Sequence, residues 1–301
     1  MEQPTKPGDS NRITREYFDS LLIEMRHIDA IIPSTEYTLF GETFSTPIMT
    51  AAFSHLSHFG FHKDGMVEMA KGAKAANAVN FAGMGSDEEL SRMTATGAKT
   101  IKIVKPEVDN EVILKNIRHA EACGCLAVGM DVDHAYNGKG QQDVIDSMPM
   151  TGKSFDEIKQ FVNATKLPFI IKGVLSAQDA VKCLEAGVQG IVVSHHSGII
   201  EYAVPPLMIL PQIIEAIKQR NGNMQIFADC GISSGYDAFK AIALGAHAVS
   251  LGRSVLPALK ADGAKGVEEA FKNATAQLAG IMARTNTPTL ASIEPSLIHR
   301  R

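Results

Sequence analysis

The feature that most constrains the fold is an alternation, repeated eight times, of a short apolar segment and a segment with helical character. Short apolar runs rich in β-branched residues, bounded by polar residues and glycines, are typical of strands buried in a parallel sheet. The eight apolar segments lie at residues 46–52, 79–82, 100–104, 126–131, 168–172, 190–193, 224–229 and 246–251. The chain is therefore expected to build an α/β fold with eight parallel strands.

Eight such units predict a closed (β/α)8 TIM barrel in a single domain. An open, doubly wound sheet is the alternative, but no Gly-x-Gly-x-x-Gly turn follows the first apolar segment, as a dinucleotide-binding fold requires. Residues 1–40 are interpreted as a lead-in with a helix at 14–25, and residues 41–301 as the barrel.

Helical segments fill the spaces between the expected strands. They are predicted at residues 65–76, 87–90, 110–122, 177–186, 209–220 and 236–244, with a long loop over 134–153. Ser154 and Glu157 have capping-box spacing, which predicts that a further helix begins there.

Composition excludes several classes of function. The 301 residues carry a formal net charge of -4, so no basic excess indicates binding to nucleic acid. No apolar run approaches 18 residues and the first residues lack the order of a signal peptide, so we expect a cytoplasmic protein without a membrane span. The four cysteines form no C-x-x-C pair, so neither a disulfide framework nor a metal site is expected. For Cys230, a small residue in a tight turn is favoured over a reactive thiol.

Polar side chains gather where the expected strands end, which is the rim where barrels carry their active sites. These residues are Asn80, Lys102, Asp131, Asp133, Lys172, His195, His196, Asp229 and Arg253. The loops after the last two strands contain Gly231 and Gly252 beside Arg253, a combination suited to binding a phosphate group. An isolated His-His pair is more often structural than catalytic, but its position at this rim favours chemistry.

Several stretches carry a resemblance to a known family. Residues 170–180, 192–198 and 228–246, followed by Leu251-Gly-Arg253, resemble the FMN-dependent 2-hydroxy-acid oxidases and dehydrogenases, which include glycolate and lactate oxidases. The segment 18–52 resembles the family's entry to the first strand. The resemblance implies a TIM barrel that holds FMN, a small-molecule substrate, and a homo-oligomer of four or more subunits.

The resemblance also implies roles for individual residues. His196 matches the catalytic general base, Asp133 the aspartate that pairs with it, and Lys172 the lysine beside flavin N1. His195 stands where the family has an asparagine, and its role is left open among the catalytic candidates. The implied cofactor contacts are Ala51, Asn80, Lys102, Lys172, Ser194, Asp229, Gly231, Gly252 and Arg253.

Departures from the family pattern concern the substrate. Ile199 and Gly140 stand where the family has the two arginines that bind the substrate carboxylate. Lys102 and Lys139 are candidates to replace the lost positive charge, although a flavin contact or a solvated lysine is an equally good interpretation. We therefore expect oxidation of a hydroxy acid or alcohol by hydride transfer to flavin N5, on a substrate other than a simple short 2-hydroxy carboxylate.

Two other functions remain open from the sequence. One is a non-redox isomerase or lyase on the same barrel, flavin-assisted or flavin-free, similar to the flavin-dependent type of isopentenyl diphosphate isomerase. The other is a catalytically silent protein that binds flavin or another phosphorylated ligand. The electron acceptor leaves no motif in the chain.

Overall fold

A computed structural model describes residues 6–56 and 64–301. Eight parallel strands form one sheet with the order β4-β13-β12-β11-β10-β7-β6-β5. Their bounds are β4 (Ile48–Thr50), β5 (Asn80–Ala82), β6 (Thr100–Val104), β7 (Ala127–Asp131), β10 (Phe169–Val174), β11 (Gly190–Val193), β12 (Gln225–Ala228) and β13 (Ala248–Leu251). The first and last members also meet, because the amide of Thr50 donates to the carbonyl of Val79 at 3.1 Å and Phe53 bridges to Ala82. The predicted (β/α)8 barrel is confirmed.

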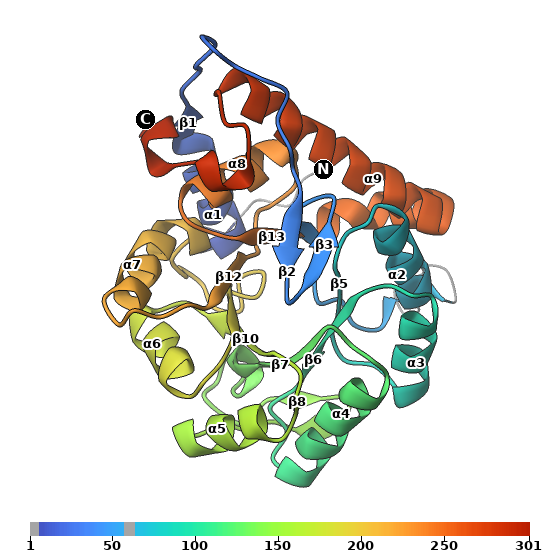
Figure 1. Ribbon diagram of the computed structural model, residues 1–301. Helices are drawn as coiled ribbons and strands as arrows, with labels where there is room; N and C mark the ends of the chain where they lie inside the picture. The colour runs from blue at the N-terminus through green and yellow to red at the C-terminus, as the bar shows by residue number, and fades with distance from the viewer. Residues whose placement is uncertain (1–5, 57–63) are drawn as a thin grey trace.

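Helices surround the strands as an outer ring (Figure 1). They are α2 (Gly65–Ala75), α3 (Asp87–Ala95), α4 (Asn110–Ala122), α5 (Phe155–Asn163), α6 (Ala177–Glu185), α7 (Pro206–Lys218), α8 (Gly235–Ala243) and α9 (Leu256–Arg284). The capping box predicted at Ser154 and Glu157 is present at the start of α5. Helix α9 is interrupted at Asp262 and Gly263, which leave helical geometry.

The strands direct alternate residues to the two sides of the barrel wall, as the two-residue period of a strand requires. Inside the barrel, Phe81, Ile101, Ile103 and Phe227 belong to one buried cluster. The hairpin of β2 (Tyr37–Leu39) and β3 (Glu42–Phe44) adds its own side chains to this cluster. It lies across the amino-terminal end of the barrel, in front of the strands in Figure 1. Functional groups are therefore restricted to the opposite end.

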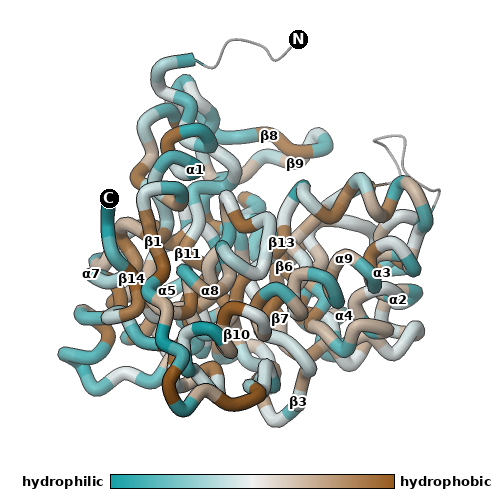
Figure 2. Tube along the Cα trace, turned by 90° about the horizontal axis from the view of Figure 1, so that it is seen from above, coloured by the Kyte–Doolittle hydropathy of each residue, from teal (hydrophilic) through white to brown (hydrophobic). Residues whose placement is uncertain are grey.

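The opposite end carries two additional elements (Figure 2). One is α1 (Ser10–Ser20), and the other is the hairpin of β8 (Val144–Ile145) and β9 (Met148–Pro149). The described part of the chain also contains the short 3-10 turns η2 (Val132–His134), η3 (Arg253–Val255), η4 (Leu290–Ser292) and η5 (Pro295–Leu297). Near the ends of the chain, β1 (Leu21–Ile23) pairs with β14 (Ile298–Arg300).

Three sequence predictions need correction. The N-terminal helix predicted at 14–25 covers Ser10–Ser20 instead, because Asp9 caps its first turn and residues 21–23 form a strand with β14. The helix predicted at 209–220 begins at Pro206, whose fixed φ suits the first turn. The loop predicted over 134–153 contains the β8–β9 hairpin. Among the described residues, no helix is long and apolar enough to cross a membrane.

Candidate active site

Inward-facing residues at the carboxyl ends of four strands bring charge to the barrel mouth. Lys105 follows β6, Asp131 ends β7, Lys172 lies on β10 and Asp229 follows β12. A cavity of about 370 Å³ opens here, within the range of about 300 to 1,000 Å³ that is usual for small-molecule sites. Its lining consists of Arg15, Ala51, Ala52, Phe53, Lys172, His196, Ser197, Asp229, Cys230, Gly231, Ile232, Ser233, Gly252, Arg253 and Ser254.

His196 is directed into the mouth by an unusual backbone. His196 and Ser197 both have positive φ, at 49° and 56°, in the left-handed region that costs a side-chain-bearing residue energy. The hydroxyl of Ser194 accepts a hydrogen bond of 3.0 Å from the amide of His196 and so supports this turn. Nδ1 of the ring lies 2.8 Å from Oδ1 of Asp133 and 3.3 Å from Oδ1 of Asp131.

The neighbours of Nδ1 fix its protonation. Nζ of Lys172 lies 3.0 Å from Nδ1, but an ammonium group and a protonated ring nitrogen cannot donate to each other. Two carboxylates surround the same nitrogen, so Nδ1 carries a hydrogen that it donates to Asp133. The ammonium of Lys172 donates instead to Oδ1 of Asp131, at 3.3 Å.

Asp131 is the centre of a buried charge network. Its side chain accepts from Lys172 and, at 2.7 Å, from Lys105; the exposed fractions of the three residues are 3%, 5% and 9%. Burial opposes the charge of Asp131, but the adjacent Lys172, His196 and Lys105 outweigh it and lower its pKa well below the usual value. Burial likewise opposes the charge on Lys172, and the carboxylates of Asp131 and Asp229 raise its pKa above the usual value.

The pKa values of His196 and of its partner Asp133 are both raised. Burial alone lowers the pKa of His196, but the hydrogen bonds to Asp131 and Asp133 raise it to about 9. Burial raises the pKa of Asp133, and the nearby charge of Asp131 adds to that rise. A histidine held by two carboxylates is thus a strong proton acceptor at the mouth of the barrel.

At the other end of the cavity, glycines and an arginine form a surface suited to the phosphate of FMN. Gly231 has a φ of 80°, and a Cβ there would lie 2.9 Å from Cγ2 of Thr14, so only glycine fits. A Cβ on Gly252 would meet no atom within 4 Å, so its backbone faces open space. Within the described residues, the amides of Gly231 and Gly252 donate to no protein acceptor. Free amides beside the exposed guanidinium of Arg253 fit a phosphate group.

The structure brings most of the predicted site residues together. Ala51, Lys172, His196, Asp229, Gly231, Gly252 and Arg253 line the cavity. Asp133 and Ser194 lie directly behind, bonded to His196. The thiol of Cys230 also lines the cavity and donates to Asp229, and burial raises its pKa to about 12, which makes it a poor nucleophile.

His195 has a different position from His196. Its side chain is buried, with Nε2 2.8 Å from the hydroxyl of Thr14 on α1, and Nδ1 accepts from the amide of Gly198 at 2.9 Å. Burial lowers its pKa, so the ring is neutral near pH 7. The two adjacent imidazoles therefore lie in different surroundings: His196 lines the cavity, and His195 is buried under α1.

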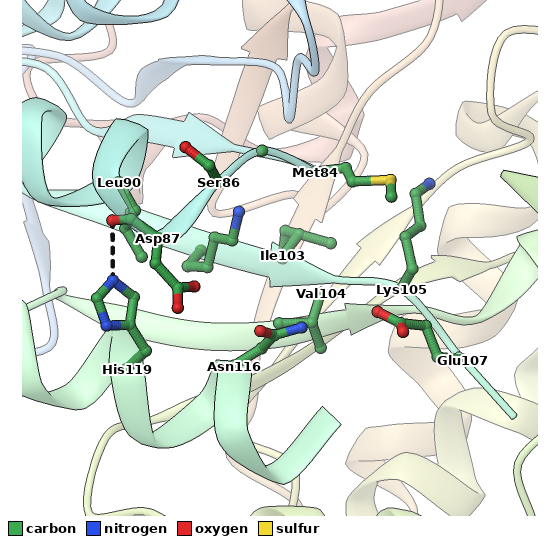
Figure 3. Close-up of a pocket in the computed structure, with 12 residues that line it drawn as sticks. Met84, Ser86, Asp87, Leu90, Ile103, Val104, Lys105, Glu107, Asn116 and His119 are labelled. Atoms are coloured by element: carbon green, nitrogen blue, oxygen red, sulfur yellow. Dashed lines mark hydrogen bonds between the residues drawn. The ribbon is translucent and has the colours of Figure 1, made fainter. Parts of the chain in front are cut away.

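Asn80 and Lys102 lie outside the mouth, on the outer face of the barrel wall. Asn80 bonds to Thr50 and Thr100, and Nζ of Lys102 donates to the carbonyl of Gly83. Lys102 lines a separate cavity of about 30 Å³ between β6 and helices α3 and α4 (Figure 3). Burial there lowers the pKa of Lys102 to about 8. Lys105 also lines this small cavity, but its ammonium group lies 2.7 Å from Asp131 and so turns toward the mouth.

Sequence reasoning missed four groups at the mouth, namely Arg15, Lys105, His134 and Asp143. Arg15 projects from α1 and donates to Asp237 at 3.0 Å and to the carbonyl of Gly231 at 3.2 Å. A signal existed for Lys105, because it continues the inward series of Ile101 and Ile103. No comparable signal marked Arg15, which reaches the mouth from the lead-in.

Four donor groups at the mouth lie close enough to hold a metal ion, with ligand atoms within 4.8 Å of one another. They are Asp131, Asp133, His134 and His196. The ammonium groups of Lys172 and Lys105 already neutralise Asp131, however, and supply the charge that a cation would bring. We assign no metal to this cluster.

The two positions at which carboxylate-binding arginines were sought carry no charged side chain. Ile199 turns its backbone amide to the carbonyl of His195, and Gly140 lies in an exposed turn with a φ of 73°. Neither residue lines the cavity.

Comparison with known proteins identifies the family. The sequence matches the FMN-dependent dehydrogenase family over residues 2–153 and 140–300. It is 28% identical over 308 residues to an L-lactate oxidase of Roseobacter sp. (strain GAI101), covering 88% of this chain and 79% of that protein. It is 30% identical over 272 residues to a 4-hydroxymandelate oxidase of Amycolatopsis orientalis, covering 78% and 74% of the two chains.

The fold comparison agrees. A structure of a mandelate oxidase variant with 2-hydroxy-phenylacetamide superposes with a TM-score of 0.87 at 26% identity, covering 99% of this chain and 91% of the other. Fold, cavity and sequence match together establish that this chain belongs to the FMN-dependent dehydrogenase family and is an oxidoreductase that uses FMN as its cofactor.

Proposed function

We propose that this enzyme oxidises a hydroxy acid or an alcohol, with His196 as the general base. The observation that carries the proposal is the position of His196 at one end of the cavity, with Nδ1 fixed by Asp133 and the phosphate-binding surface at the other end. When bound, FMN supplies the acceptor for the hydride that leaves the substrate carbon.

The residues of this chain divide the remaining work. Nε2 of His196 takes the hydroxyl proton, and Asp133 and Asp131 stabilise the imidazolium that results. Lys172 presents a permanent positive charge where negative charge accumulates during the transfer. Arg253 and the amides of Gly231 and Gly252 bind the phosphate end of the cofactor.

The substrate is proposed to differ from a simple short 2-hydroxy carboxylate. One support for this proposal is that Ile199 and Gly140 offer no charged donor to a carboxylate. The other is that the two lysines near His196 are not free to bind one. Lys172 and Lys105 are both engaged with Asp131. The two guanidinium groups that line the cavity are also engaged: Arg15 donates to Asp237 and to the carbonyl of Gly231, and Arg253 donates to Asn11. A small carboxylate thus loses the contact that orients it.

A panel of hydroxy substrates tests this proposal. The FMN-loaded protein is mixed anaerobically with lactate, glycolate, larger 2-hydroxy acids and neutral alcohols, and flavin bleaching is followed by absorbance. At least one larger or neutral compound should bleach the flavin about tenfold faster or more than lactate or glycolate, since a charged hydrogen bond contributes about 1.5 to 3 kcal/mol. Fastest bleaching by lactate or glycolate contradicts the substrate proposal, and no bleaching by any compound contradicts the oxidation.

Replacing the base should stop the chemistry and leave the cofactor in place. We expect His196→Ala to bleach about 100- to 10,000-fold more slowly with the best substrate, which is the usual contribution of general base catalysis. The visible spectrum of bound FMN should persist. His27→Ala, at an exposed histidine that does not line the cavity, is the control and should react normally. Undiminished bleaching in His196→Ala would assign the base to another group.

Comparing the binding of FMN with that of riboflavin tests whether Arg253 contacts the phosphate group or the flavin ring. Arg253→Ala should weaken FMN binding about 10- to 100-fold, as expected for one lost charge-assisted contact. Binding of riboflavin, which lacks the phosphate, should be unchanged. Fluorescence quenching measures both affinities, with Arg220→Ala, at an exposed arginine in the turn after α7, as the control. An equal loss for both flavins argues against a phosphate contact.

The raised pKa of His196 has a consequence for the pH profile. A base must be unprotonated, so the limiting rate of flavin bleaching should rise with pH and level off above about pH 9. Asp133→Asn removes one carboxylate that favours the imidazolium, so its inflection should move to lower pH. Stopped-flow absorbance from about pH 6 to pH 10 gives both curves. Asp156→Asn, at an exposed aspartate, should keep the original inflection, and an unmoved inflection in Asp133→Asn refutes the pairing.

A further inference from the structure

A second imidazole lies against the proposed base. His134 ends the 3-10 turn after β7, and its ring centre lies 4.2 Å from that of His196 at an interplanar angle of 87°. The two Nε2 atoms are 3.1 Å apart. Nδ1 of His134 lies 3.0 Å from Oδ2 of Asp143. These contacts form a continuous chain from His196 through His134 to Asp143.

The hydrogens along this chain can be assigned. One hydrogen can lie between the two Nε2 atoms, so one ring donates and the other accepts. Burial lowers the pKa of His134, and the nearby charge of Lys105 lowers it further, whereas the pKa of His196 is raised. In the protonated form of His196, which its raised pKa favours at neutral pH and which forms when it takes the substrate proton, the shared hydrogen therefore belongs to Nε2 of His196. Nδ1 of His134 then carries a hydrogen that it donates to Asp143, and this bond lowers the pKa of Asp143.

Charged groups from the neighbouring elements keep His134 from retaining a second proton. Lys105 faces it from the end of β6, and His196 from the loop after β11. Asp131, at the end of β7, favours the charged ring, but Lys105 and Lys172 already neutralise that carboxylate. Asp143 is the remaining acceptor. A proton that reaches Nε2 of His134 is thus favoured to leave from Nδ1.

The chain of contacts ends near solvent. The side chain of Asp143 is 24% exposed, and that of His134 is 22% exposed. The loop between β7 and β8 holds the pair together, because the amide of Asp143 donates to the carbonyl of Ala135 and Tyr136 bridges to Gln142. His134 and Asp143 therefore lie opposite each other at the base of one turn.

We propose that His134 carries the substrate proton from His196 to Asp143 and then to water, which rests on the proposed role of His196 as base. The N–H bond at Nε2 of His196 breaks while one forms at Nε2 of His134. The hydrogen on Nδ1 of His134 passes to the carboxylate of Asp143 or to water. His134 stays neutral but ends with its hydrogen on Nε2. Because its side chain is 22% exposed, water can take that hydrogen while Asp143 returns one to Nδ1, so the net result is release of the substrate proton to water and both rings are restored for the next turnover. Nε2 of His196 first accepts the proton of the substrate hydroxyl and then, in a later step, gives that proton to His134.

Kinetics of the FMN-loaded enzyme test the relay. His134→Phe keeps an aromatic ring but removes both nitrogens. Below about pH 8, its steady-state turnover should fall about tenfold or more, because His196 resets slowly, and added imidazole should restore part of the rate. The rate of a single round of flavin bleaching, started after the enzyme has equilibrated with buffer, should fall less than the steady-state rate, because a single round does not require His196 to be reset. Asp143→Asn, which keeps a hydrogen-bond acceptor but cannot take the proton, should also slow turnover.

A second readout needs no cofactor. In the FMN-free protein, exchange of the Nε2 proton of His196 with water, measured by nitrogen-edited NMR, should slow about tenfold or more in His134→Phe. His299→Phe is the matched control, since His299 also pairs with a carboxylate, Glu24 at 2.7 Å, far from the mouth. Unchanged turnover and exchange in His134→Phe overturn the relay. Undiminished bleaching in His196→Ala instead overturns the role of His196 on which the relay rests.

Discussion

The site depends on the pairing of opposite charges around Asp131. A carboxylate and two ammonium groups, each less than a tenth exposed, would be costly to bury separately. Together, Asp131, Lys172 and Lys105 compensate one another, and the imidazole of His196 joins them at 3.3 Å. The network connects the ends of strands β6, β7 and β10, which sets the positions of the groups that face the cavity. The barrel provides the frame, and this network fixes the chemistry within it.

The sequence predicted the barrel well because its signals are local. Each strand is a short apolar run, and the capping box of α5 and the bounds of β6 and α4 were predicted correctly. The N-terminal segment was predicted less well. Its strand β1 is stabilised by β14, which lies at the other end of the sequence. No local sequence pattern indicates a strand partner that far away in the chain. The helix was therefore predicted to continue through residues 21–25, although it ends at Ser20.

The same distinction applies to the site. Counting alternate residues along β6 separates Lys105, which faces the mouth, from Lys102, which faces α3 and α4. That count was available from the sequence. The contact between His134 and His196 was not, because it joins residues separated by 62 positions and depends on the left-handed turn at His196. Likewise, the different surroundings of His195 and His196 could not be predicted, because His195 bonds to Thr14 on α1, which lies far away in the sequence.

The contacts of the N-terminal segment also bear on how the protein is made. Helix α1 holds the loop of His196 through Thr14 and Asn11, and it reaches residues 231–253 through Arg15 and Asn11. Strand β1 must wait for residues 298–300 before it has a partner. On the ribosome, β1 is synthesised well before β14 and must remain without this partner until residues 298–300 are made. A chain interrupted before β14 would have every strand of the barrel but would lack the partner of β1, the strand that directly follows α1.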